Sequence, residues 1–226
     1  MKKIKNLTVK QIIEFRRKTL KNREVFIKKL NKEKVSNESG GDYWISSTSA
    51  ISRAFKSNNN EEIVRKINDL LTEIERTSYR KTKIMYQRNV EILHNYEDFD
   101  LNSLKPSNKI EFQKRPKILE IIEILKLPVR ITPSHVYTYE KDGLKFVGGL
   151  WIVCKLNGFS INELASYTEG LYKYLQKNYS NKYLIDKEYC IALDAFTGRY
   201  ISYCEIESGL YTTIFNSTIP LIKEAI

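Results

Sequence analysis

The run KFVGGLWIVCK, residues 145–155, constrains the fold of this chain more than any other feature of the sequence. Its second half is apolar at consecutive positions, so the strand that it predicts is buried on both faces, as at the centre of a sheet. The preceding dipeptide Asp142-Gly143 is a typical hairpin turn, and residues 135–140 before it are rich in β-branched and aromatic side chains. We therefore predict a central strand over 145–155, with another strand over 135–140.

The rest of the carboxyl-terminal half contains further strand and helix signals. β-branched and aromatic residues predict strands over 118–126, 129–132, 189–195 and 200–205, with a tight turn at Thr197-Gly198. Ser160 and Glu163 have the spacing of a capping box and start a helix that runs to about Tyr179, and a short helix starts near Ile219. This order of elements predicts an α+β fold, in which one long helix packs on a mixed sheet.

The amino-terminal part of the chain is predicted to be helical. Thr8 and Gln11 have capping-box spacing, and the apolar residues that follow predict one amphipathic helix from about 8 to 31. Other capping and apolar patterns predict a short element from Ser46 to about Phe55 and helices over 59–76 and 78–94. We expect the chain to divide into a helical region over 1–96, an acidic, proline-containing linker over 97–116, and an α+β domain over 117–226.

Positive charge is concentrated at the amino terminus. The chain has a net charge of +11, and its first 35 residues contain thirteen Lys and Arg but three acidic residues. The polar face of the predicted first helix carries Arg16, Arg17, Lys18, Lys21, Lys28 and Lys29. This face is either a solvated helix surface or a binding surface for the phosphates of DNA or RNA, and in the second case deletion of residues 1–35 should abolish binding. Membrane-surface binding ranks lower because the apolar face has few Trp and Phe residues.

The composition disfavours several other classes of protein. No run approaches the roughly 18 consecutive apolar residues of a membrane span, and the charged start MKKIKNLTVKQ lacks the apolar stretch of a signal peptide, so we expect a cytoplasmic protein. Cys154, Cys190 and Cys204 lie far apart in apolar surroundings and are predicted to be free, buried thiols. His94 and His135 have no partner at metal-ligand spacing, so no structural zinc site is expected.

The order strand, strand, strand, helix, strand, strand over residues 116–206 resembles the core of the PD-(D/E)XK, or restriction-endonuclease-like, superfamily. Members of this superfamily place an acid near the start of the second core strand and an acid-x-Lys triplet on the third, around one or two divalent metals. Thr132-Pro133-Ser134-His135 is similar to the first motif, with Ser134 in place of the aspartate. Val153-Cys154-Lys155 resembles the triplet, with Val153 in place of the acid, so that Lys155 alone matches.

The resemblance implies a degenerate site at Ser134, His135 and Lys155. A divergent metal-dependent nuclease would have to recruit carboxylates from elsewhere, and Glu120, Glu123 and Asp194 are the candidates. Two acids would then have to lie within metal-bridging distance of Lys155. A divalent metal is expected only for this alternative, and no other cofactor is expected.

The sequence contains no complete catalytic motif, and its leading interpretation is a non-catalytic binding or accessory protein. In this hypothesis the basic first helix contacts nucleic-acid phosphates. A third hypothesis is a structural protein that self-associates, because the 15 tyrosines suit protein interfaces as well as core packing.

Overall fold

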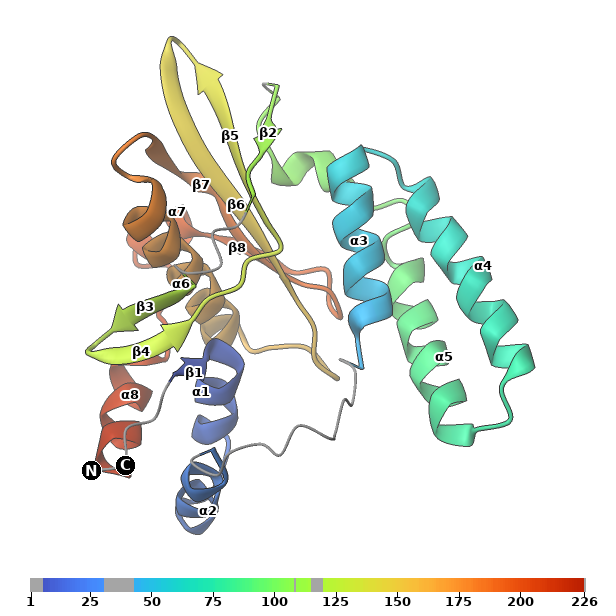
Figure 1. Ribbon diagram of the computed structural model, residues 1–226, viewed down its shortest axis with the longest axis horizontal. Helices are drawn as coiled ribbons and strands as arrows, with labels where there is room; N and C mark the ends of the chain where they lie inside the picture. Colours follow the sequence, from blue (N-terminus) through green and yellow to red (C-terminus); the bar gives the residue numbers. More distant parts are fainter. Residues whose placement is uncertain (1–5, 31–42, 108, 115–119, 226) are drawn as a thin grey trace.

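The computed structural model describes residues 6–30, 43–107, 109–114 and 120–225 (Figure 1). Its main sheet has the strand order β2-β5-β6-β7-β8 among these residues. The strands are Glu111–Phe112 (β2), His135–Lys141 (β5), Leu144–Val153 (β6), Leu184–Asp194 (β7) and Tyr200–Ser202 (β8). β6 is central and pairs antiparallel with β5 and parallel with β7, which confirms the position predicted for residues 145–155. Asp142 and Gly143 both have positive φ, as the β5–β6 hairpin turn requires.

A smaller sheet pairs a strand near the amino terminus with two strands from the middle of the chain. Its strands are Leu7–Thr8 (β1), Ile121–Ile124 (β3) and Leu127–Arg130 (β4), in the order β1-β4-β3. β1 runs parallel to β4 and places Thr8 opposite Arg130. This pairing joins residues that are far apart in the sequence, so no local pattern predicts it.

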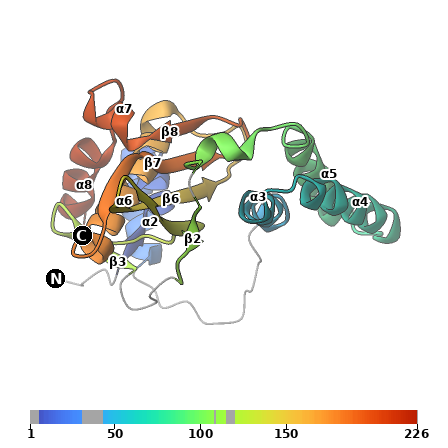
Figure 2. The same ribbon diagram turned by 90° about the horizontal axis from the view of Figure 1, so that it is seen from above.

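Helices cover both faces of the main sheet (Figures 1 and 2). On one side lie Val9–Arg16 (α1), Ile161–Tyr179 (α6), Tyr203–Glu207 (α7) and Phe215–Glu224 (α8), and on the other lie Ile45–Ser57 (α3), Glu61–Arg76 (α4) and Arg80–His94 (α5). Trp151 and Val153 belong to the α1/α6/α8 core, whereas Leu150 and Ile152 belong to the core under α3–α5. The run of apolar residues in β6 therefore reflects burial on both faces, and the predicted α+β fold is confirmed.

The predicted helix over 8–31 is wrong in one respect, because the structure divides it into α1 and Leu20–Leu30 (α2). The Thr8–Gln11 capping box starts α1 as expected. α1 ends at Arg16, and the side chain of its C-cap residue, Arg17, binds Glu163 at the start of α6. A contact across the fold therefore interrupts a sequence that is locally helical throughout. Residue 31 lies outside the described part of the chain.

The predicted strand over 200–205 is also shorter than expected. β8 ends at Ser202, and a capping box between Ser202 and Glu205 starts α7 at Tyr203. The serines at 46–49 do not cap α3, which begins at Ile45 with Trp44 as its N-cap. Two of the hydroxyls in this segment, on Ser47 and Thr48, instead donate to the carbonyl of Trp44.

The three-part division of the chain stays a prediction. Within the expected linker, Leu101–Leu104 form a short 3-10 helix (η1) with both leucines buried. The amine of Lys105 donates to the carbonyl of Phe55 at the end of α3, and β2 pairs with β5. Residues 108 and 115–119 lie outside the described residues. None of the described helices is long and apolar enough to cross a membrane.

Candidate functional site

A cavity of about 500 Å³ lies between the start of α1, the first turns of α3 and the end of β6. We call it the α1–α3 cavity. Its lining combines two cations, Lys10 and Arg130, with the hydroxyl groups of Thr8, Thr48, Ser49, Ser52, Thr132, Ser134 and Tyr167. None of the described residues that line it is acidic. This combination suits an anionic ligand, which hydroxyl and cationic donors can hold without repulsion from a carboxylate.

The elements around the α1–α3 cavity explain how its cations come together. The parallel pairing of β1 with β4 puts Arg130 beside Thr8, and Lys10 follows in the first turn of α1. On the sheet side, the hydroxyl of Ser134 accepts a hydrogen bond from the backbone N–H of Ile152 at 3.0 Å. Ser134 therefore sits beside the end of β6, at the carboxyl edge of the parallel β6–β7 pair, where ligands of open sheets commonly bind.

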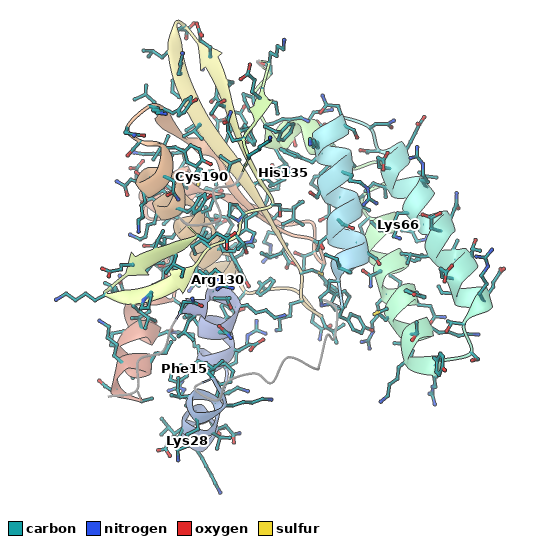
Figure 3. All side chains as sticks on the ribbon, in the orientation of Figure 1. Phe15, Lys28, Lys66, Arg130, His135 and Cys190 are labelled. Carbon is teal, nitrogen blue, oxygen red and sulfur yellow. The ribbon has the colours of Figure 1, made fainter. Side chains whose placement is uncertain are left out.

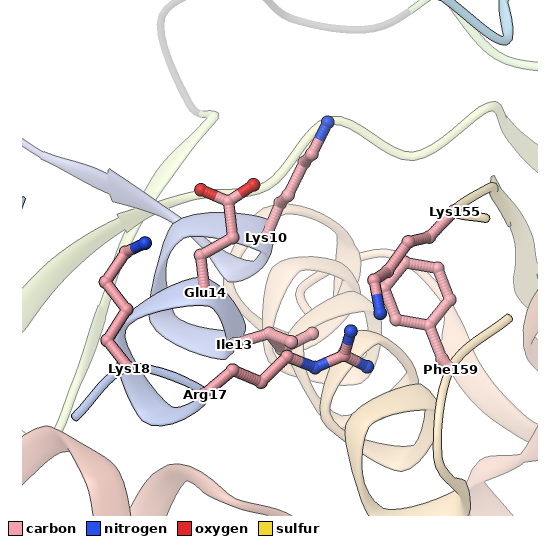
Figure 4. Close-up of a pocket in the computed structure, with 7 residues that line it drawn as sticks. All are labelled: Lys10, Ile13, Glu14, Arg17, Lys18, Lys155 and Phe159. Atoms are coloured by element: carbon pink, nitrogen blue, oxygen red, sulfur yellow. The ribbon is translucent and has the colours of Figure 1, made fainter. Parts of the chain in front are cut away.

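A second cavity, of about 270 Å³, shares Lys10 with the α1–α3 cavity (Figure 4). We call it the Lys155 cavity. Its remaining lining is Ile13, Glu14, Arg17, Lys18, Lys155 and Phe159. Figure 4 shows Arg17 and Lys155 directed toward the same space beside the ring of Phe159. We refer to the two cavities together as the basic cleft.

Arg17 has an internal partner in this cleft. Its guanidinium donates two hydrogen bonds to the carboxylate of Glu163, one of them from Nε at 2.6 Å. This hydrogen bonding raises the pKa of Arg17. Burial acts to raise the pKa of Glu163, but hydrogen bonds from Arg17 and Ser160 outweigh it, so this carboxyl has a lowered pKa. The charge of Arg17 is therefore largely balanced by the carboxylate of Glu163.

The other basic residues predicted on the first helix lie in three different places. Arg16 donates to the hydroxyls of Ser217 and Thr218 on α8, whereas Lys18 lines the Lys155 cavity. The remaining members, Lys21, Lys28 and Lys29, are exposed on α2. Figure 3 places Lys28 on the far side of α1 from Arg130. The six predicted residues therefore do not form one continuous face.

The degenerate-site candidates also separate. Ser134 lines the α1–α3 cavity and Lys155 lines the adjoining cavity. His135 instead turns toward α3, where its Nε2 lies 2.7 Å from the hydroxyl and 3.0 Å from the carbonyl oxygen of Ser52. Its ring packs against Phe55 and Phe112, with centroids 5.2 Å away in both cases. These contacts make His135 a packing residue between α3 and the sheet.

The carboxylates proposed for a metal site do not gather at Lys155. Glu14 is the one acid among the described residues that line the Lys155 cavity. Asp194 is buried and accepts hydrogen bonds from the backbone N–H groups of Phe159 and Phe196 and from the Thr197 hydroxyl, while burial raises its pKa. Glu120 and Glu123 belong to the small sheet and its edge. The described residues contain no group of three His, Cys, Asp or Glu that could hold a metal ion, so this donor set does not fit one.

None of the three cysteines forms a disulfide among the described residues, and their burial differs from one to the next. Cys190 is buried, and burial raises the pKa of its thiol. Cys154 is half-buried and lines the α1–α3 cavity. Cys204 is exposed on α7, so the expectation that all three are buried is wrong. Five tyrosines, Tyr96, Tyr137, Tyr139, Tyr167 and Tyr174, are buried in the two cores.

Sequence reasoning missed Lys10 and Arg130. Lys10 had no specific signal, because Glu14 lies one turn further along α1 and can balance its charge. Arg130 had none, since its position depends on the pairing of β1 with β4. No protein-family model, curated protein or solved structure matches this chain. The functional argument therefore depends on the geometry of the cleft.

Proposed function

We propose that this protein binds nucleic acid through the phosphate backbone, in the basic cleft, without cleaving it. The observation that supports the proposal is the sharing of Lys10 by two cavities. With Arg17 paired to Glu163, the cations that remain along the described lining are Lys10, Lys18, Arg130 and Lys155.

The chemistry of the lining favours phosphate over other anions. A row of cations accommodates a polyanion with regularly spaced charges, and each neutralised phosphate releases condensed counterions. The hydroxyls of Thr132 and Ser134 can donate hydrogen bonds to phosphate oxygens, and such contacts position a strand without reading its sequence. The exposed lysines of α2, Lys21, Lys28 and Lys29, can extend this contact beyond the cleft.

A binding assay tests the proposal directly. Labelled single-stranded and duplex DNA and RNA are titrated with the protein at about 50 mM and about 200 mM salt, a range over which phosphate contacts lose much of their affinity. The double substitution Lys10→Ala and Arg130→Ala should weaken binding at the lower salt concentration. The double substitution Lys141→Ala and Lys145→Ala, which removes two exposed charges at the β5–β6 hairpin, is the matched control and should not. Failure of the wild-type protein to bind any of these probes at low salt would refute the proposal.

A divergent nuclease is the second candidate, because β5, β6, α6, β7 and β8, with β7 parallel to β6, follow part of the element order of the resemblance noted in the sequence, although β3 and β4 lie in the smaller sheet. Glu14 and Lys155 also line one cavity. A metal site needs more carboxylates than the described residues place there, so we rank this candidate below binding. Degradation of a labelled strand in the presence of Mg²⁺ or Mn²⁺, lost in Glu14→Gln, would favour it.

A further inference from the structure

The α1–α3 cavity is larger than a phosphate group requires. Its volume of about 500 Å³ lies within the roughly 300–1,000 Å³ of pockets that enclose small organic ligands. The adjoining Lys155 cavity has about 270 Å³. A phosphate held at Lys10 therefore leaves most of the larger cavity available for another part of the same ligand.

The walls of the α1–α3 cavity differ in chemistry. The exposed side chain of Ile45 provides apolar surface, beside a Trp151 ring that is only 7% exposed, whereas Thr48, Ser49 and Thr132 provide hydroxyls. A nucleobase has the matching pair of properties, an apolar face and an edge of hydrogen-bond donors and acceptors. Thr48 and Ser49 already donate their hydroxyl protons to the carbonyls of Trp44 and Ser46, so they can accept hydrogen bonds from a base edge, whereas Thr132 can also donate one.

The cations that line the α1–α3 cavity are placed to contact the phosphates of a nucleic-acid strand whose base enters the cavity. Lys10 and Arg130 line the α1–α3 cavity, and Lys10 also lines the cavity that contains Lys155 and Lys18. A nucleotide with its base in the larger cavity can place its phosphate at Lys10 and the following phosphate toward Lys155. A base within a duplex is stacked and paired, so it cannot enter such a cavity until it is unstacked, which costs a few kcal/mol.

We infer that the α1–α3 cavity receives one unpaired nucleotide, so that the protein binds single-stranded nucleic acid in preference to duplex. This inference rests on the phosphate binding proposed above and adds a base-binding position to it. The cleft predicts that a free nucleotide binds far more weakly than a strand, which also reaches Lys155.

The test fills the cavity without changing its charge. Ser49→Phe places a ring in the cavity, and the Ser49 hydroxyl makes a local hydrogen bond to the carbonyl of Ser46 on α3, so little else is removed. Ser57→Phe is the control, with the same substitution at the exposed end of the same helix. We expect Ser49→Phe to lower the affinity for a labelled single strand by about tenfold or more, the effect of losing one base contact. Its affinity for duplex should stay within about twofold of wild type, as should both affinities of Ser57→Phe.

The outcomes separate this inference from the proposed function. Equal wild-type affinities for single strand and duplex, both salt-dependent, would overturn the nucleotide cavity and leave phosphate binding standing, and this comparison requires no variant. An unchanged single-strand affinity in folded Ser49→Phe, verified by thermal unfolding, would also overturn it. If adenosine or uridine monophosphate bound as tightly as a strand, the ligand of the cavity would be a free nucleotide, and the inference would be overturned. Absence of binding to every probe would refute the proposed function itself.

Discussion

The salt dependence of binding gives the sharpest test of the cleft, and Lys10 is the residue to change. Lys10 lines both cavities, so its charge contributes wherever a strand lies in the cleft. Lys10→Ala removes this charge while the Thr8–Gln11 capping box that starts α1 remains. The side chain of Lys10 is exposed, so we expect the fold to tolerate the substitution.

The size of the effect follows from the number of cations in the cleft. Lys10, Lys18, Arg130 and Lys155 remain along the described lining once Arg17 is paired with Glu163. Each contact with a single-strand phosphate contributes about 0.7 to the slope of log affinity against log salt, so four contacts predict a slope of about −3. Lys10→Ala should reduce it to about −2. Between about 50 and 200 mM salt the wild-type affinity should then fall about fifty-fold, and that of the variant about twenty-fold.

Fluorescence anisotropy of a labelled single strand, measured at several salt concentrations, gives both slopes. Lys141→Ala should retain the wild-type slope, because this exposed residue lies on β5 at the hairpin end, away from the cleft. A wild-type slope for Lys10→Ala would show that strands do not use the cleft. If substitution of the exposed α2 lysines, Lys21, Lys28 and Lys29, removed the slope instead, the basic surface predicted from the sequence would be the binding surface.

Three further predictions concern the residues that hold the cleft in shape. Glu163→Gln should lower the free energy of unfolding by about 1–2 kcal/mol at neutral pH, a value discounted for the partial exposure of Arg17. Because the pKa of Glu163 is lowered in the folded state, this difference should disappear as pH falls through that pKa in urea titrations. Asp194→Ala should lower the free energy of unfolding by about 3 kcal/mol or more in the same assay, since three hydrogen-bond donors lose their acceptor. Burial raises the pKa of Asp194, so ionisation of this carboxyl should destabilise the wild-type protein as pH rises through that pKa. Gly158→Ala should lower the melting temperature, because Gly158 has φ of +70° and a Cβ there would lie 2.6 Å from an Asp194 carboxylate oxygen; an unchanged melting temperature would contradict this packing.

Local signals in the sequence predicted the elements that depend on neighbouring residues. The capping boxes at Thr8 and Ser160 start α1 and α6 as expected, and Asp142-Gly143 forms the hairpin turn. The error at the end of β8 was avoidable, since Ser202 and Glu205 have the same capping-box spacing that was recognised at Ser160. The serines at 46–49 are an exception, because α3 begins at Ile45 and none of them caps it.

The site depended on contacts that no local pattern encodes. Arg130 reaches the α1–α3 cavity because β1 pairs with β4, and the charge of Arg17 is paired because Glu163 lies beside it. The sequence showed how many charges the amino terminus carries, but the partners of those charges come from other parts of the chain. Counting charges along the sequence therefore overestimated the basic face of the first helix and missed Lys10 and Arg130 in the cleft.

Deletion of the amino terminus cannot isolate a binding surface, because the deleted residues also belong to the core. Among the residues removed by deleting 1–35 are Val9, Ile12, Ile13 and Phe15, all buried in the α1/α6/α8 core, and the whole of β1. Loss of these side chains would destabilise the fold by several kcal/mol, since each large core truncation costs about 2–5 kcal/mol. A deletion that abolished binding would then report unfolding as readily as the loss of a binding surface. Single-charge substitutions at Lys10 and on α2 separate these two effects, because they change charge while the buried face of α1 stays intact.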